Sequence, residues 1–408
     1  MIKRGIGIIS GVALALAAAA LPASAGLASP VRAARAAPAP VAWVVNQAVN
    51  SARKGSLTPI DTATGTVIRT IPLARNAIGV AIAPGGKTAW VALNLRRLDG
   101  HGYVAPVNTS TYQVGRRVEA GFIPGTMLVT PNGKTLYVAD GLVGEVTPVD
   151  TATGTAGRPI RTGANPFATT MAVTPDGRTV FVVNEEPDGT VTPISTATNT
   201  AGKNIKVGVT PGPIVMAPDG KTAYVLNLAE GDPGKGSVTP VNTATRTAGK
   251  PIPIKGAAFP LAFSLMVISP GGRTLYVAGN TTLTPIDTAT GSTRPSIRVA
   301  PRHGGDYGAA ITPDGRTIYV EGTFARSTRG YIVPVSTATG AVGKAITFRG
   351  YPAAMAITPD GKTLYVLRAG APEAGLPQDV LPVSTATGTA ARPISTGLQP
   401  TAIAISGG

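Results

Sequence analysis

A phrase of eleven residues recurs along this chain and constrains its fold more than any other feature. Ile357–Leu367 reads ITPDGKTLYVL, and close variants such as VTPDGRTVFVV and ITPDGRTIYV lie upstream. Its glycine occurs at seven positions, namely Gly86, Gly133, Gly177, Gly220, Gly272, Gly315 and Gly361. A second phrase, of the type TPIDTATG, has its proline at Pro59, Pro106, Pro148, Pro193, Pro240, Pro285, Pro334 and Pro382, with gaps of 42 to 49 residues. A period of this length indicates a repeat architecture with room for four short strands in each unit.

Both phrases contain the residues that tight turns need. In Thr-Pro-Asp-Gly, proline presets φ for the first turn position and glycine accepts the positive φ that closes a hairpin. The preceding residues are small and apolar, as in TMAV, which suits a strand near a crowded axis, and the following residues alternate, as in KTAYVLN. The Asp-Thr-Ala-Thr-Gly run is a second turn, whose short side chains can bond nearby backbone amides. Lys or Arg in the last strand of each unit suits an outer edge that must not pair with other molecules.

One position in the second strand is aromatic in every unit: Trp43, Trp90, Tyr137, Phe181, Tyr224, Tyr276, Tyr319 and Tyr365. This position takes both tryptophans of the chain. We interpret the recurring aromatic residue as a wedge between neighbouring sheets. A stripe of rings that stacks on a ligand is the alternative.

The two ends of the repeat region predict how the array closes. The first strand of the repeat region, VAWVVN, is of the second type, and the last, PTAIAIS, is of the first type. Pairing the C-terminal strand with Val41–Asn46 would complete the first sheet and remove its open edge. The sequence therefore predicts an all-β fold, a closed β-propeller of eight four-stranded antiparallel blades. A seven-bladed ring with one irregular unit is the alternative.

Two of these second strands carry a family resemblance. Tyr137–Asp140 reads YVAD and Phe181–Asn184 reads FVVN, each between a PDGK-like turn and a TPIDTATG-like turn. They resemble the YVTN β-propeller repeats of the YncE-like family, over the region from Val41 to the C-terminus. The family's Asn is replaced in three units, by Gly279, Gly322 and Arg368. The resemblance implies a propeller, mostly seven-bladed in that family, and export from the cell, without a catalytic motif to transfer.

The N-terminus has the pattern of an export signal. Lys3 and Arg4 precede the apolar run GIGIISGVALALAAAAL, and Ala23–Ala25 is an A-x-A cleavage site. A transmembrane anchor is the alternative, because the apolar run is near the lower length limit for a spanning helix. We expect a secreted, extracellular or cell-envelope protein without stable membrane insertion after cleavage. The predicted organisation is a signal peptide over 1–25, a flexible Ala/Pro-rich tail over 26–40 and one propeller domain over 41–408.

The residue inventory argues against several chemistries. The chain has no cysteine, so a disulfide, a thiolate metal site and a Cys nucleophile are excluded. Its two histidines, His101 and His303, lie about four blades apart and do not suggest a zinc or copper site. Acidic loops such as EEPDG match no known calcium loop spacing. We therefore predict no metal ligands, no cofactor and no catalytic residues.

The units agree on one face of the predicted ring and differ on the other. The PDGK and DTATG turns share one face, whereas the loops after the second strands and the connections between blades share the opposite face. A scaffold usually carries recognition on its variable loops, although drift without a ligand is the alternative. We predict a ligand site at the channel mouth on the variable face, formed by Asn46, Asn94, Asp140, Asn184, Asn227, His303, Asp306, Tyr307, Tyr351 and Arg368. Asn side chains both donate and accept hydrogen bonds, which suits a polar ligand, but they could equally cap strand ends.

The formal charge of +16, or +14 without Lys3 and Arg4, favours anionic partners. Seven of these charges occupy the same turn position: Lys87, Lys134, Arg178, Lys221, Arg273, Arg316 and Lys362. Our leading hypothesis is a monomeric, non-enzymatic binding protein whose partner is a protein or a cell-envelope polymer. The alternatives are a lactonase-like hydrolase that uses His303 or Arg368, and a weak polyanion or nucleic-acid binder that uses the basic ring.

Overall fold

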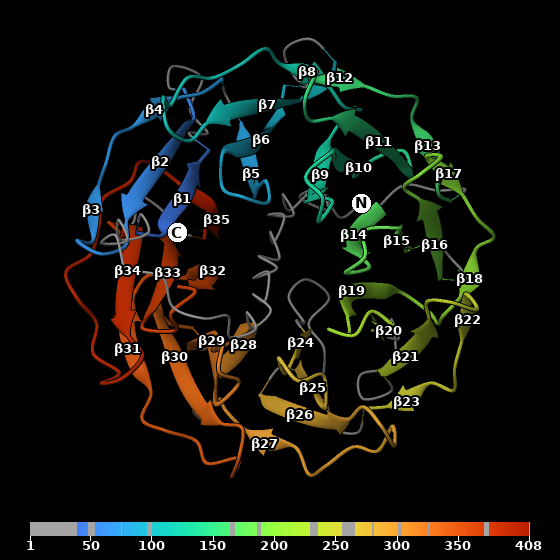
Figure 1. Cartoon of the computed structure of the whole chain (residues 1–408). Coiled ribbons are helices and arrows are strands. Elements are labelled where there is room, and N and C mark those ends of the chain that lie inside the picture. Colours follow the sequence, from blue (N-terminus) through green and yellow to red (C-terminus); the bar gives the residue numbers. More distant parts are fainter. Residues whose placement is uncertain are drawn as a thin grey trace, which may run out of the picture.

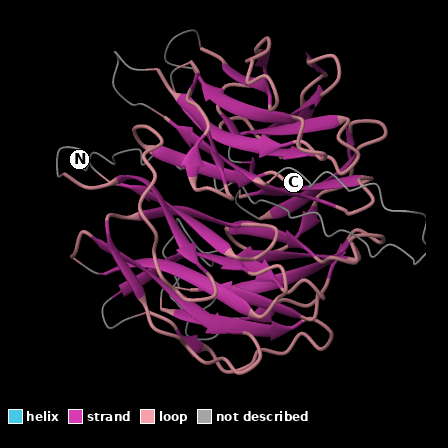
Figure 2. Cartoon of the chain, turned by 60° about the vertical axis from the view of Figure 1, so that its left-hand side comes forward, coloured by secondary structure: helices cyan, strands magenta, loops and turns pink. Residues whose placement is uncertain are grey.

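The described strands stand in a ring of sheets around one axis (Figure 1). The computed structural model describes residues 39–47, 54–74, 76–95, 100–163, 168–185, 189–228, 236–254, 266–279, 281–300, 304–324, 326–370 and 375–407. These residues form eight antiparallel sheets and contain no helix (Figure 2). The chain is an eight-bladed β-propeller, and the seven-bladed alternative is wrong. The predicted signal peptide and almost all of the predicted tail lie outside the described residues.

In seven blades the strands run outwards from the axis in sequence order, and in blade 1 the last strand, β35, is the innermost. Eight strands face the axis: β5 (Ala77–Ile82), β9 (Pro124–Val129), β14 (Ala168–Val173), β19 (Pro211–Met216), β24 (Met266–Ile268), β28 (Gly304–Ile311), β32 (Pro352–Ile357) and β35 (Pro400–Ile405). The second strands are β1 (Val41–Asn46), β6 (Thr88–Asn94), β10 (Thr135–Asp140), β15 (Thr179–Asn184), β20 (Thr222–Asn227), β25 (Thr274–Ala278), β29 (Thr317–Phe324) and β33 (Thr363–Ala369). The third strands are β2 (Ser56–Asp61), β7 (Gly102–Asn108), β11 (Glu145–Asp150), β16 (Thr190–Ser195), β21 (Ser237–Asn242), β26 (Thr282–Asp287), β30 (Arg329–Ser336) and β34 (Gln378–Ser384).

The outermost strand is short or divided in each blade. It consists of β3 (Thr66–Val67) and β4 (Ile71–Pro72) in blade 1, β8 (Val118–Glu119) in blade 2, β12 (Thr155–Ala156) and β13 (Ile160–Arg161) in blade 3, β17 (Thr200–Ala201) and β18 (Ile205–Lys206) in blade 4, β22 (Thr247–Ala248) and β23 (Ile252–Pro253) in blade 5, β27 (Ile297–Arg298) in blade 6 and β31 (Ile346–Arg349) in blade 7. In blade 8 single bridges at Ile394 and Ala390 take its place.

The repeated proline explains this division. Each proline lies opposite the wedge aromatic of its blade, as Pro148 lies opposite Tyr137. A proline has no N–H to give to the outer strand, so the ladder is interrupted beside it. The Pro148 carbonyl still accepts a hydrogen bond of 2.7 Å from the Gly157 N–H, and a Cβ at Gly157 would lie 3.1 Å from Cγ of Pro148. The outer chain therefore bends over the proline ring and pairs on either side of it, as β12 and β13.

The ring closes where the two ends of the domain meet, as predicted. β1 pairs with β35 in antiparallel register, with Trp43 opposite Ala404 and Val44 opposite Ile403. The hydroxyl of Ser406 also donates to the Val41 carbonyl at 3.3 Å. The first sheet is therefore built from both ends of the domain, and β1 is paired on both sides.

The hydrophobic core is divided among the interfaces between blades. The eight wedge aromatics are 0 to 5% exposed, which confirms the wedge prediction. Each belongs to its own cluster of buried side chains, and each cluster joins two neighbouring blades. The Tyr137 hydroxyl reaches the next blade and donates to Oδ1 of Asn199 at 2.5 Å. Burial raises the pKa of Tyr137 to about 12, so the phenol stays neutral in this position.

Hydrogen bonds between the repeated turns stabilise one face of the ring, which we call the turn face. In seven blades a threonine of the second turn donates to the glycine carbonyl of the first turn: Thr109, Thr151, Thr196, Thr243, Thr288, Thr337 and Thr385. The turn glycines also approach the previous blade closely. Gly220 has a φ of 72°, and a Cβ there would lie 2.8 Å from Cδ of Pro175. Glycine is therefore required at this position both by the turn and by the neighbouring blade.

We expect Trp90→Ala to destabilise the ring strongly. Trp90 is 1% exposed between blades 2 and 3, and removing a buried indole costs about 3–5 kcal/mol in free energy of unfolding. Ile68→Ala, at a 40% exposed position of the outer strand, is the control and should change this free energy by less than about 1 kcal/mol. Urea unfolding monitored by circular dichroism measures both. Equal effects would contradict the wedge assignment.

Candidate functional site

Exposed apolar side chains are concentrated on the face opposite the turn face, which we call the loop face. It comprises the loops between second and third strands and the connections between blades. Among the described residues, seven large hydrophobic side chains are exposed: Ile68, Val114, Phe122, Val143, Val209, Val342 and Tyr351. Phe122, Val209 and Tyr351 lie in connections between blades, and Val143 lies in a loop after a second strand. The other three lie in the outer segments, and none lies in the turns of the turn face.

The predicted site residues lie singly around the ring, and several of them fasten neighbouring blades together. Asn46 is 1% exposed, and its side-chain N–H group donates to Oγ1 of Thr58 and to the Thr396 carbonyl, both at 3.1 Å. Thr58 donates to the same carbonyl at 2.8 Å. Thr396 belongs to the chain that arrives from blade 8. The Asn46 amide therefore joins the first blade to the last.

Asn184 does the same in blade 4, whereas Asn227 bonds within its own blade 5. Asn184 donates to the Thr162 carbonyl at 3.1 Å and to Thr192 at 2.8 Å. Asn227 donates to Thr239 at 2.9 Å. Their Oδ1 atoms are buried and have no hydrogen-bond partner within the described part of the chain. These amides thus cap strand ends, and any role in ligand binding stays a prediction.

Asp140 occupies the same position in blade 3, but it accepts hydrogen bonds where the asparagines donate them. Its Oδ2 accepts the Phe122 N–H at 2.6 Å and its Oδ1 accepts the Leu142 N–H at 2.7 Å. Burial raises the pKa of Asp140, and these backbone N–H groups oppose the rise by stabilising the carboxylate. Asp140 therefore fixes two backbone segments of the loop face, namely the connection that enters blade 3 and the loop that follows β10.

Arg368 replaces the amide in blade 8. Its Nε and Nη2 donate to the two carboxylate oxygens of Asp379, both at 2.7 Å, and its Nη1 donates to the Arg349 carbonyl at 3.2 Å. Both side chains of the pair are largely buried, at 8% and 17% exposed. This ion pair fills the place of the Asn–Thr pair and again holds the chain that arrives from the previous blade.

The remaining predicted residues fall into three groups. Asn94 ends its strand one residue later than the others, because Leu93 occupies the position equivalent to Asn46. Tyr351 is 37% exposed where the chain enters blade 8. His303 lies outside the described residues, and Asp306 and Tyr307 lie in β28 with side chains that are not described.

Sequence reasoning missed a cluster of rings beside blades 2 and 3, which we call the aromatic patch: His101, Tyr103 and Phe122 with Arg117 and Glu119. The His101 and Phe122 rings are nearly parallel, at 10° with centroids 6.5 Å apart, and Tyr103 lies 6.4 Å from His101. The Arg117 guanidinium lies over the Tyr103 ring, 5.2 Å from its centroid. Phe122 is 43% exposed. A bulky aromatic residue in a connection between blades was the only signal in the sequence.

A buried carboxylate lies in blade 7. Glu321 is 4% exposed, and the seven equivalent positions are apolar: Val45, Ala92, Ala139, Val183, Leu226, Ala278 and Leu367. Gly308 lies opposite in β28, and a Cβ there would lie 2.5 Å from Oε1 of Glu321. Its Oε2 has no hydrogen-bond partner among the described residues. Burial raises the pKa of Glu321 from 4.5 to about 8.

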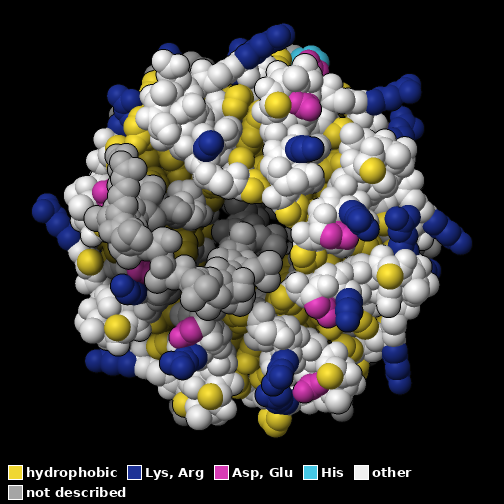
Figure 3. Space-filling view, in the orientation of Figure 1, with side chains coloured by type: hydrophobic (Ala, Val, Ile, Leu, Met, Phe, Trp, Pro, Cys, Tyr) yellow, Lys and Arg dark blue, Asp and Glu magenta, His cyan; other side chains and the backbone are white. Residues whose placement is uncertain are grey.

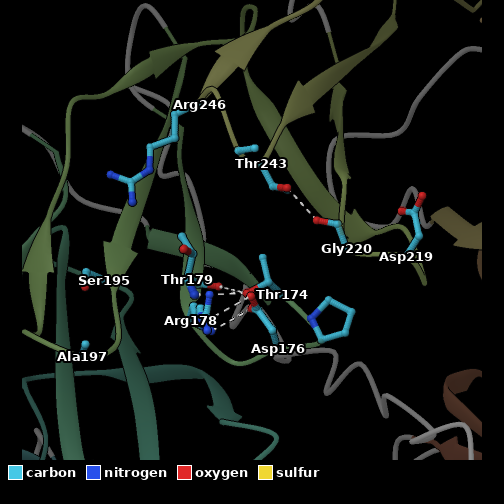
Figure 4. A pocket seen from close by; sticks show the side chains of 12 residues that line it. Thr174, Asp176, Arg178, Thr179, Ser195, Ala197, Asp219, Gly220, Thr243 and Arg246 are labelled. Atoms are coloured by element: carbon cyan, nitrogen blue, oxygen red, sulfur yellow. Dashed lines mark hydrogen bonds and ion pairs between the residues drawn. The ribbon is translucent and has the colours of Figure 1, made fainter. Parts of the chain in front are cut away.

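The turn face has a shallow depression between blades 4 and 5, with a volume of about 670 Å³ (Figure 4). Its charged lining residues are Asp176, Arg178, Asp219 and Arg246. Arg178 lies 3.8 Å from Asp176. Basic and acidic side chains also lie side by side in several blades in Figure 3. This pairing weakens the positive field that a ring of Lys and Arg alone would create.

The described residues contain no group of three or more His, Asp or Glu side chains that could hold a metal ion. They also contain no helix with the length and apolar character needed to cross a membrane.

Comparisons with known proteins support the fold. No protein-family model matches the chain, and no curated protein matches it. Among solved structures, the hydrazine synthase of Kuenenia stuttgartiensis matches with a TM-score of 0.58 and 20% identity over 76% of this chain and 96% of that one. The dihydro-heme d1 dehydrogenase NirN, in complex with DHE, matches with a TM-score of 0.71 and 13% identity over 92% of this chain and 77% of that one. At these identities the likeness shows a propeller fold alone.

We expect Glu321→Gln to remove a pH-dependent loss of stability. The unfolded chain releases the Glu321 proton near pH 4.5 whereas the folded chain holds it to about pH 8, so wild-type stability falls as pH rises between these values. The variant should match wild type near pH 4.5 and exceed it at pH 8 by roughly 3–5 kcal/mol. Thermal unfolding of both proteins across this range measures the difference. A constant difference at all pH values would contradict the assignment.

We expect Asp140→Asn and Asn184→Asp both to destabilise the protein. Asp140 and Asn184 occupy equivalent positions in blades 3 and 4, so each variant introduces the residue that the other blade has. The amide at position 140 leaves one backbone N–H without its acceptor, and the carboxylate at position 184 faces oxygens that need donors. Each change should cost about 1–3 kcal/mol. Urea unfolding near pH 7 tests the pair. Tolerance of both exchanges would show that these bonds do not hold the blades.

Proposed function

We propose that this protein is an exported β-propeller of the YVTN-repeat, YncE-like kind that binds a cell-envelope partner through its loop face. The export signal pattern over 1–25 and the YVTN-like second strands support the location and the family. The partner is a protein or a polymer of the envelope. The closed ring and the Lys and Arg residues on its outer strands favour a monomer.

The exposed apolar side chains of the loop face carry this proposal. Phe122, Val143, Val209 and Tyr351 are 37 to 56% exposed, and they come from three different blades. Single exposed hydrophobic residues are common on any protein. Among the described residues, four of the seven lie on the variable face and none in the turns of the opposite face, which favours a binding role for the loop face over drift. Apolar and aromatic side chains on a rigid scaffold are the anchors that a binding partner uses.

The two alternative functions have less support. The hydrolase would use His303 or Arg368; His303 lies outside the described residues, and Arg368 is held by Asp379. The polyanion binder depends on the basic turn position, but four of the seven units place an Asp two residues before the cation: Asp176, Asp219, Asp314 and Asp360.

Capture of envelope material by immobilised variants tests the proposal. A loop-face variant, Phe122→Ser with Val209→Ser and Tyr351→Ser, should lose about tenfold or more of the material that wild type captures, because it removes three anchors. A turn-face variant, Arg178→Ser with Arg316→Ser and Lys362→Ser, is the matched control and should capture as much as wild type. The amount of envelope material that each variant captures at 50 mM and 500 mM salt shows which face binds it. Loss in the turn-face variant alone, together with loss at high salt, would favour polyanion binding instead.

A further inference from the structure

We propose that the aromatic patch on blades 2 and 3 binds pyranose rings of a neutral envelope polysaccharide. This inference rests on the proposed function, because it names the chemistry of one partner for the loop face. The patch lies beside β7 and β8, towards the outer edge of the ring, and not at the channel mouth where the ligand site was predicted.

Two glycines and one carboxylate bring the rings together. The Gly102 N–H donates to the Gly121 carbonyl at 2.7 Å, and the Ala120 N–H donates to the Gly102 carbonyl at 3.0 Å. A Cβ at Gly102 would lie 2.3 Å from Cδ of Pro124, so only glycine allows the connection to run this close to β7. Asp140 then fixes Phe122 through its backbone N–H. The exposed Phe122 ring is thus attached to a rigid support, which lowers the entropy lost on binding.

The rings offer apolar faces of the size of a sugar. His101 and Phe122 are nearly parallel, and both remain open to solvent, with 45% of the His101 side chain and 43% of Phe122 exposed. A pyranose presents C–H groups on its face, and these carry a small positive charge. The negative face of an aromatic ring attracts such groups. An exposed ring on a fixed backbone is therefore a stacking surface for a sugar.

The polar groups around the rings suit hydroxyls. His101 Nδ1 lies 2.8 Å from Oε1 of Glu119, and Arg117 lies over Tyr103. The patch thus combines the donors of an arginine and an imidazole with the acceptors of a carboxylate. A hydroxyl both donates and accepts, so sugar hydroxyls can use both kinds of group.

The same groups disfavour a phosphate-rich polymer or a nucleic acid. The Glu119 side chain is 58% exposed, and its negative charge balances the positive charge of Arg117, so the pair adds no net charge that would attract a phosphodiester. Tyr103 is tilted by 58° from His101, so the three rings do not form a parallel series on which successive bases could stack. A protein partner that uses Phe122 as its anchor is a separate proposal, and the experiment below identifies it.

Retention on insoluble polysaccharides tests the inference. Wild type should bind at least one of cellulose and xylan, whose 1,4-linked sugars carry vicinal diols, at pH 7 with similar affinity at 150 mM and 1 M salt. Phe122→Ala should weaken that binding about tenfold, which corresponds to the loss of one stacking contact. His101→Ala should weaken it several-fold, and Phe122→Trp should retain it. Val342→Ala, which removes an apolar side chain as exposed as Phe122 but in an outer segment away from the loop face, is the control and should bind as wild type does.

Treatment of the envelope extract separates this inference from the proposed function. Periodate, which cleaves the vicinal diols of sugars, should abolish capture by wild type, whereas protease should not. Capture that resists periodate and disappears with protease would identify a protein partner, overturn the sugar inference and leave the proposed function standing. Failure of wild type to bind any polysaccharide, or unchanged binding by Phe122→Ala, would also overturn it.

Discussion

The contact of one aromatic ring with the neighbouring sheet is the interaction on which this structure depends. The chain has no single central core, because each of the eight wedges lies in a separate apolar cluster between two blades. Each blade is therefore stabilised by its two neighbours, as in other repeat proteins. An open ring would leave one such interface exposed. Pairing of β1 with β35 supplies the eighth interface, which contains Tyr365.

Five of the eight interfaces have a polar side chain of the second strand at their loop-face end: Asn46, Asp140, Asn184, Asn227 and Arg368. The wedge excludes water from the middle of the interface, so hydrogen bonds near its end must be made within the protein. Asn46 and Asn184 meet this need by donating to a backbone carbonyl of the preceding blade. Asp140 and Arg368 meet it with different chemistry at the same position. A ligand at the channel mouth would compete with these bonds for the donors of the amides.

The repeat made the fold predictable because its information is local. Turn residues, alternation and the aromatic position are each specified within a few neighbouring residues, and eight copies reinforce the same interpretation. The patch was not predictable in this way. His101 and Phe122 belong to segments that occur once, and their contact depends on how closely Gly102 lets the chain approach β7. The hydrogen bonds of Asn46 were also hidden, since Thr396 lies at the other end of the sequence.

Residues that depart from the repeat differ in whether they gain a contact within the protein. Arg368 departs together with Asp379, so that charge balances charge. Tyr112 replaces the turn glycine at a φ of 61°, and its ring lies beside Trp43 and under Arg69. In both places the changed residue gains a contact within the protein. Phe122 also departs from the repeat, but much of its ring remains in water, where an apolar side chain gains no stability for the fold. On the proposed function, Phe122 contributes through a partner that covers it, as do Val209 and Tyr351 elsewhere on the loop face.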